Sequence, residues 1–168
     1  MTPPVSAVPS ELTWSTTTHN RGYELKRNGE VVGTLRHPAL FSSSYLAETI
    51  YGRWTFRRCG LLGASAQILD TTSQQQVATF RSVWGGGGIL TFGEGETFHL
   101  ECKGWSHPVW NITTGSGRIA LSLHAREKTV ELPVPAEVPE GRLYLLLVFT
   151  LYRVQQAEED AASVAMVG

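Results

Sequence analysis

The ten residues Leu143–Tyr152 restrict the possible folds of this chain more than any other segment does. Nine of them are apolar, and only Thr150 is polar. A helix on a protein surface shows a single apolar stripe, whereas this segment would be apolar on every side. Three environments accept such a helix: a membrane, the centre of a helical protein, or the interior of a β-structure.

The length of the apolar segment and its flanking residues argue against a membrane span. A spanning helix needs about 20 apolar residues, whereas a run of about 10–14 is more typical of a buried core. Arg142 and Arg153 bracket the segment, and Pro135, Glu137 and Pro139 lie just before it. We therefore predict that the chain has no transmembrane segment.

The part of the chain before this segment predicts strands and no second helix. From Glu11 to about Leu132, apolar residues recur with a period of two, which is typical of strands half-buried on one face. The pair Asn28-Gly29 suits a type I′ hairpin turn, because both central residues of that turn need positive φ. About a dozen strands at roughly ten-residue spacing, without βαβ alternation, indicate a sandwich or a barrel. The predicted strands are Leu12–Thr17, Tyr23–Arg27, Glu30–Arg36, Tyr45–Tyr51, Arg53–Arg58, Ala66–Leu69, Gln76–Val83, Ile89–Phe92, Thr97–Cys102, Pro108–Thr113, Arg118–His124 and Thr129–Leu132.

The change of period after these strands predicts one C-terminal helix. Pro139 suits the first turn of a helix, and Glu140 favours the positive end of its dipole. The interior of a closed barrel widens with the number of strands: about eight strands leave an interior that side chains fill, and roughly 16–18 leave a water channel. A barrel of about twelve strands lies between these and has room for a helix ~10–12 Å across. We therefore predict a mainly β protein, a closed antiparallel barrel of about twelve strands around a buried hydrophobic helix at about residues 140–157. The predicted core side chains of the helix are Leu143, Leu146, Leu147, Phe149 and Tyr152.

Length and the two ends indicate one domain with short extensions. A chain of 168 residues is the size of a single domain. Residues 1–10 contain three prolines and predict a flexible lead-in, without the basic segment and apolar core of a signal peptide. Residues 11–157 are predicted to form the barrel with its helix. Residues 158–168 are predicted to be a frayed tail.

Charge and cysteine content limit the partners and the compartment. The net charge is -1, from 14 basic and 15 acidic residues, and this balance argues against a nucleic-acid partner. Cys59 and Cys102 have neither the spacing of a zinc site nor the number of a disulfide framework. They fit two reduced thiols in a cytoplasmic protein, with a disulfide between them as the alternative.

Five segments and the predicted barrel carry a resemblance to a known superfamily: Tyr23–Gly33, Gly52–Phe56, Val77–Phe80, Trp105–Trp110 and Leu143–Tyr152. Over residues 11–157 the chain resembles short bacterial members of the tubby C-terminal-like superfamily, which includes tubby domains, phospholipid scramblases and LURP-one-related proteins. The resemblance implies a non-enzymatic binding or scaffold domain. Because tubby domains bind phosphoinositide headgroups through surface Lys and Arg, it also implies anionic phospholipid headgroups or a protein as partner, with peripheral association at membranes. The sequence lacks the acidic calcium loop and the cysteine cluster associated with scramblases.

One cluster of basic residues is the candidate anion-binding site. Trp54 and Phe56 are expected to share one face of their strand, so the arginines beside them point outward. Arginines can hold phosphate groups by bidentate hydrogen bonds. The residues near the Asn-Gly turn add to this patch if the two strands are neighbours. The candidate residues are Lys26, Arg27, Arg53, Arg57 and Arg58.

A carrier protein and a metal-dependent enzyme are the alternatives to a binding domain. A carrier of a small apolar ligand needs an empty barrel lumen, which the helix is expected to occupy. A metal-dependent enzyme needs three or four converging ligands, and the best cluster is His99, Glu101 and His107. The sequence has no nucleophile motif such as GxSxG. We therefore expect no catalytic residues, no metal and no cofactor.

Overall fold

The computed structural model describes residues 11–17, 22–38, 43–61, 64–83, 87–133 and 135–167. The predicted lead-in at residues 1–10 lies outside this part of the chain. The elements in order are β1 (Leu12–Thr17), β2 (Gly22–Arg27), β3 (Glu30–Arg36), β4 (Ser44–Thr49), β5 (Gly52–Cys59), β6 (Ser65–Asp70), β7 (Gln76–Ser82), β8 (Gly88–Phe92), β9 (Thr97–Lys103), β10 (Val109–Thr114), β11 (Ile119–His124), β12 (Thr129–Glu131) and α1 (Glu140–Val167).

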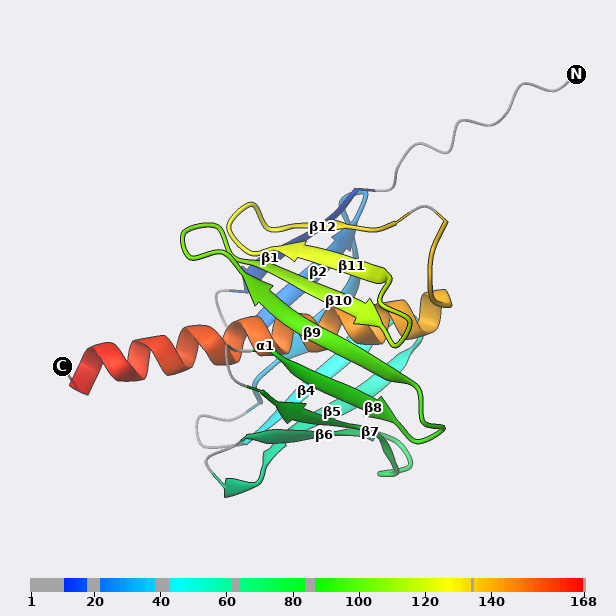
Figure 1. Cartoon of the computed structure of the whole chain (residues 1–168), viewed down its shortest axis with the longest axis horizontal. Coiled ribbons are helices and arrows are strands. Elements are labelled where there is room, and N and C mark those ends of the chain that lie inside the picture. Colours follow the sequence, from blue (N-terminus) through cyan, green and yellow to red (C-terminus); the bar gives the residue numbers. More distant parts are fainter. Residues whose placement is uncertain are drawn as a thin grey trace, which may run out of the picture.

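The strands form a closed antiparallel barrel, which confirms the predicted fold class. Each strand pairs with its neighbours along the chain, and β1 pairs with β12 to close the sheet, so that Leu12 lies opposite Val130. The turn between β2 and β3 also agrees with the prediction, because Asn28 and Gly29 have φ values of 51° and 84°. The topology is therefore a simple up-and-down meander with α1 as its last element (Figure 1).

Helix α1 fills the lumen of the barrel. The predicted core residues Leu143, Leu146, Leu147, Phe149 and Tyr152 are each at most 5% exposed. Figure 1 shows the helix running through the barrel and leaving it at the end marked C. The single polar residue of the apolar segment, Thr150, is satisfied locally, because its hydroxyl donates a hydrogen bond to the carbonyl of Leu146 at 2.7 Å.

An aromatic cluster ties α1 to the strands at mid-length. The ring of Phe149 lies 5.4 Å from that of Phe56 on β5 and 5.1 Å from that of Phe80 on β7, measured between centroids. Tyr152, one turn along the helix, lies 5.6 Å from Phe149 and 5.3 Å from Phe56. Such edge-to-face and tilted pairs contribute beyond the area that they bury.

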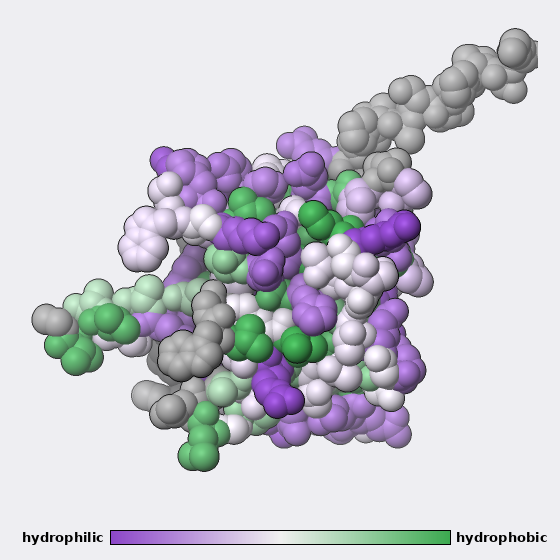
Figure 2. All heavy atoms as spheres, in the orientation of Figure 1, coloured by the Kyte–Doolittle hydropathy of each residue, from purple (hydrophilic) through white to green (hydrophobic). Residues whose placement is uncertain are grey.

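Helix α1 is longer than the sequence predicted, and this part of the prediction is corrected. The helix was expected to end near residue 157 and to be followed by a frayed tail, but it continues to Val167. The added segment is rich in alanine and contains neither glycine nor proline, so each of its residues tolerates helical geometry. Its last turn lies beyond the barrel and is apolar, with Val164, Met166 and Val167 between 74% and 89% exposed (Figure 2).

The two ends of the barrel differ in what they present. We call the end where α1 begins, near Glu140, the entry end, and the end where α1 leaves, near Glu158, the exit end. The β2–β3 turn lies at the entry end, since Arg27 contacts Glu140 there. Cys59 and Cys102 are free thiols on β5 and β9, which are not neighbouring strands.

Candidate functional site

The five basic residues singled out from the sequence do not form one patch. Strands β3 and β4 lie between β2, which carries Lys26 and Arg27, and β5, which carries the other three. Arg27 contacts Glu140 at the entry end, whereas Arg58 contacts Asp160 near the exit end. The condition for a joint patch, that β2 and β5 are neighbours, is therefore not met.

Four of these five residues also lie beside carboxylates. Ion pairs between exposed side chains lower the local positive charge and leave less of it for a phosphate group. The pairs, with their nitrogen–oxygen distances, are Lys26–Glu24 at 3.9 Å, Arg27–Glu140 at 2.6 Å, Arg53–Glu48 at 3.3 Å and Arg58–Asp160 at 3.4 Å. Arg57, on the outer face of β5, is exposed and makes no ion pair with a described residue.

A different set of arginines forms a basic surface on the outside of the barrel. Arg36 on β3, Arg57 on β5 and Arg81 on β7 are all exposed, and each points outward because it follows an inward-facing residue. We call these three residues the arginine face. Across β4, Arg36 is level with Thr55 on β5, which lies two residues before Arg57. Across β6, Arg81 is level with Cys59 on β5, which lies two residues after Arg57. The three arginines thus form a diagonal row across five adjacent strands.

The arginine face lies away from the carboxylates of the same strands. Within β3–β7 the acidic residues are Glu30, Glu48 and Asp70. Glu30 and Asp70 stand at the ends of strands that adjoin entry-end turns, and Glu48 aligns with Arg53 beside the β4–β5 turn. No ion pair joins a carboxylate to Arg36, Arg57 or Arg81 within the described part of the chain. The exit half of this outer surface is therefore basic.

Sequence reasoning missed Arg36 and Arg81, although a signal for both was present. Each follows a large apolar residue, Leu35 or Phe80, at the end of an alternating run, which places it on the outer face. What the sequence lacked was the order of the strands in space. The register that aligns β3, β5 and β7 decides which outward arginines are near one another, and that register depends on the closed barrel.

At the entry end, a small network fixes the start of α1. Tyr51, in the β4–β5 turn, donates a hydrogen bond to Glu140 at 2.5 Å, and Arg27 donates to the other carboxylate oxygen at 2.6 Å. Arg27 also donates to the hydroxyl of Tyr144 at 3.2 Å. The hydrogen bonds from Tyr51 and then Arg27 lower the pKa of the Glu140 carboxyl below its ordinary value.

The lowered pKa of Glu140 predicts a small acid-dependent loss of stability. An unfolded glutamate titrates near about 4.3, so the stabilisation is complete above that pH and is lost as the pH falls through the lower folded-state pKa. We expect Glu140→Gln to lower the melting temperature at neutral pH by about 1–2 °C only, because the network is exposed. The variant should also lose less stability than the wild type between about pH 5 and pH 3, in melting curves recorded across that range. Glu127→Gln, a change at an exposed carboxyl outside the network, is the control and should melt as the wild type does at each pH.

At the exit end, two tyrosines hold the helix where it leaves the barrel. Tyr23 donates a hydrogen bond to Glu158 at 2.8 Å, and Tyr45 donates to Glu159 at 2.7 Å. Burial and then the carboxylate partner raise the pKa of both tyrosines well above the ordinary value. Both hydroxyls therefore stay protonated and keep donating over the whole range in which proteins are usually studied.

The candidate metal cluster does not assemble. His99 and Glu101 are exposed on the outer face of β9, and Glu101 forms an ion pair with Lys103 at 3.3 Å. Nε2 of His107 accepts a hydrogen bond from Arg126 at 2.7 Å. Among the residues that the structure describes, no three His, Cys, Asp or Glu side chains lie close enough together to hold a metal ion.

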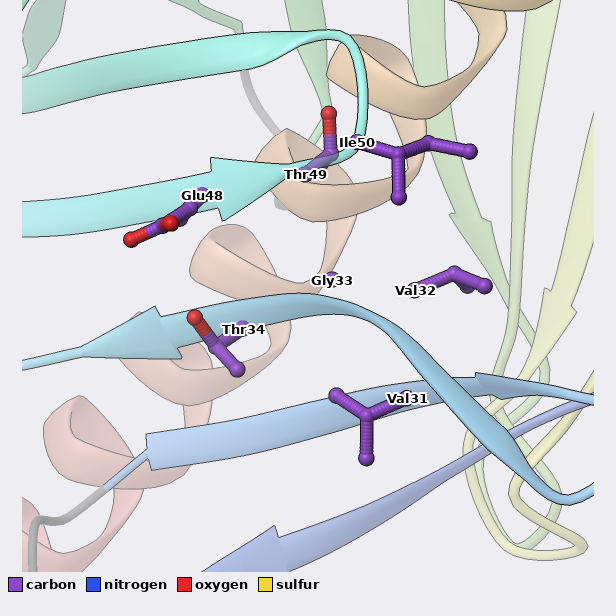
Figure 3. Close-up of a pocket in the computed structure, with 7 residues that line it drawn as sticks. All are labelled: Val31, Val32, Gly33, Thr34, Glu48, Thr49 and Ile50. Atoms are coloured by element: carbon purple, nitrogen blue, oxygen red, sulfur yellow. The ribbon is translucent and has the colours of Figure 1, made fainter.

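A shallow apolar hollow of about 370 Å³ lies on the barrel wall near the entry end. It lies at the entry end of the β3–β4 ladder, which runs from Arg36–Leu46 to Gly33–Thr49 and is followed by a hydrogen bond from the Ile50 amide to the Val32 carbonyl at 3.4 Å. Figure 3 shows Ile50 of the β4–β5 turn opposite Val32 at this end of the strand pair. The one charged residue in its lining, Glu48, is paired with Arg53, so the hollow offers no free charge to a ligand.

Comparisons of the chain with models of protein families, with curated proteins and with solved structures find no match. In the described part of the chain, no helix combines the length and the apolar character needed to cross a membrane.

Proposed function

We propose that this chain is a non-enzymatic binding domain that associates peripherally with anionic phospholipid headgroups through its arginine face. The observation that carries the proposal is the diagonal row of Arg36, Arg57 and Arg81, three exposed guanidinium groups without carboxylate partners in the described structure. The resemblance to tubby-like domains motivates the lipid class. The candidate residues Lys26, Arg27, Arg53 and Arg58 are left out of the site because they lie in ion pairs.

The filled lumen supports binding at the outer surface. A carrier of an apolar ligand would need an open cavity inside the barrel, but Leu146 and Leu147 of α1 are fully buried there. Function in a barrel of this kind then depends on groups that face the solvent. The outward arginines of β3, β5 and β7 are the best placed of these groups to meet an anionic partner.

The spacing of the arginines favours a surface that carries many phosphates over a single phosphate ion. Two strand spacings and two residues separate each arginine from the next, so neighbouring Cα atoms lie roughly 12 Å apart. At that distance each guanidinium meets a different phosphate group. A bilayer presents such an array, and each arginine near an anionic surface contributes about 1 kcal/mol.

The test is vesicle co-sedimentation of the wild type and the triple variant Arg36→Ala/Arg57→Ala/Arg81→Ala. We expect the wild type to bind phosphatidylcholine vesicles that contain phosphatidylglycerol, and to bind pure phosphatidylcholine far more weakly. The triple variant should lose roughly 100-fold in affinity, which is the loss of three contributions of about 1 kcal/mol each. Added salt should weaken binding of the wild type, because the contacts are electrostatic.

The matched control is Lys26→Ala/Arg53→Ala/Arg118→Ala, which lowers the net charge equally but removes cations that lie in ion pairs. This control should retain most of the binding. Equal losses in the two variants, or binding of the first variant at the wild-type level, would show that the arginine face is not the site. Binding of duplex DNA at the same ionic strength, with an affinity like that for the vesicles, would overturn the lipid assignment.

A further inference from the structure

A second candidate site lies at the entry end, where a pocket of about 460 Å³ opens between the first turn of α1 and the barrel rim. Its volume is in the range of small-molecule sites, which are roughly 300–1,000 Å³. Three aromatic residues from three different segments line it: Tyr51 from the β4–β5 turn, Trp54 from β5 and Phe92 from β8. We call it the mouth pocket.

The first wall of the mouth pocket, the ring of Tyr51, is held in place by contacts on two sides. The Tyr51 hydroxyl donates a hydrogen bond to Glu140, and the centroid of the Tyr51 ring lies 5.1 Å from that of Tyr144. The exposed face of Tyr51 is thus presented in one orientation without a ligand, which reduces the entropic cost of binding.

The second wall, formed by Phe92 and Arg142, is also held in place. The Arg142 guanidinium lies 3.5 Å from the centroid of the Phe92 ring. It also pairs with Glu94 at 2.6 Å and with Glu96 at 3.5 Å. Cation–π stacking and two carboxylates together leave this side chain little freedom to move into the pocket.

The helix backbone at Gly141 borders the space between the two walls. Gly141 lies in the first turn of α1, between Glu140 and Arg142, and it forms part of the lining. A larger side chain at this position would extend from the Cβ position beside Tyr51 into the mouth pocket.

The charge around the mouth pocket selects the kind of ligand. Glu94, Glu96 and Glu140 place three carboxylates beside two guanidinium groups, those of Arg27 and Arg142. Of these five groups only Glu94 and Arg142 line the pocket itself, and the five together carry one net negative charge. Tyr51 is 44% exposed, unlike Phe92, whose ring the Arg142 guanidinium covers, and an exposed aromatic face attracts cations. We infer that the mouth pocket binds a small cation with a planar aromatic body, such as an arylalkylamine.

The experiment compares two probes that share an indole body and differ in charge: tryptamine, which is a cation at neutral pH, and indole-3-acetate, which is an anion. Each is titrated into isotopically labelled wild-type protein and followed by two-dimensional NMR. We expect tryptamine to shift the backbone amides of Gly93 and Gly141 and the indole N–H of Trp54, with a Kd on the order of 1 mM. Indole-3-acetate should bind about tenfold more weakly at low salt, and added salt should narrow the difference.

Two substitutions at one position test whether the mouth pocket is the site. Gly141→Leu should weaken tryptamine binding at least about tenfold, without lowering the melting temperature, because leucine is a better helix former than glycine. Gly141→Ala keeps the space and should bind as the wild type does. The triple variant of the arginine face should also bind tryptamine as the wild type does. Ligand binding in the mouth pocket and lipid binding at the arginine face can therefore fail independently. Tryptamine binding that Gly141→Leu leaves unchanged, equal affinity for both probes at low salt, or no binding at about 10 mM would each overturn it.

Discussion

Replacing Leu147 with Asp is expected to prevent the barrel from folding around α1. Leu147 is fully buried in the lumen among apolar side chains, so the new carboxylate would have neither water nor a partner. An unpaired charge in such a place is among the most destabilising substitutions. We expect a loss of more than about 5 kcal/mol, which is comparable with the whole stability of a domain of this size. Thermal unfolding followed by circular dichroism measures the effect.

Two controls separate this effect from a general sensitivity of α1. Leu147→Met conserves volume and polarity and should cost less than about 1.5 kcal/mol. Val164→Asp places the same charge on the same helix beyond the barrel, where the side chain is exposed, and should cost less than about 1 kcal/mol. If Leu147→Asp melted within a degree or two of the wild type, the lumen could not be the core of this protein.

Replacing Phe149 with Ala is expected to cause the second largest loss. The ring is buried between Phe56, Phe80 and Tyr152, which belong to two strands and to the next helical turn. Removing it leaves a cavity that the closed barrel cannot fill by collapsing, so the cost should lie near the usual 3–5 kcal/mol for such a truncation. At about 2–4 °C per kcal/mol, the melting temperature should fall by roughly 10 °C.

The comparison with a less drastic change shows whether the cluster acts as a unit. Phe149→Leu keeps most of the volume and should cost about half as much as Phe149→Ala or less. In a double-mutant cycle, Phe149→Leu and Phe56→Leu should be coupled by at least about 0.5 kcal/mol, because the two rings are in contact. Additive effects of the two changes would mean that the edge-to-face contact contributes nothing of its own.

The barrel and its helix could be predicted because their signals are local or nearly so. Alternation with a period of two marks each strand, and β1 has the predicted bounds Leu12–Thr17. The Asn28-Gly29 turn demands positive φ, which both residues have. The apolar segment 143–152 excludes a surface helix by its composition. The length of α1 was missed because the uncharged, alanine-rich segment after Asp160 has no stop signal, and its sequence alone resembles a tail as much as a helix.

The candidate site was predicted only in its chemistry. Arginine as the residue type and β5 as one of the strands were expected, and Arg57 lies in the arginine face. The other members depend on contacts between residues far apart in the chain. Arg27 is neutralised by Glu140, more than a hundred residues later, and Arg58 by Asp160. No pattern within a strand shows such partners. The mouth pocket depends on long-range contacts as well, since it joins the β4–β5 turn, β8 and the first turn of α1.

The position of α1 at the end of the element order sets the sequence of events during synthesis. The apolar faces of the twelve strands are made before the helix that covers them, so the growing chain carries its inner surface uncovered until α1 has been translated. Strand β1 must also wait for β12, because the Leu12–Val130 pairing closes the sheet. Contacts of such long range form slowly. Nascent chains of this protein therefore pass through a stage with open strand edges and exposed apolar faces, which is the stage at which a chaperone would protect them from aggregation.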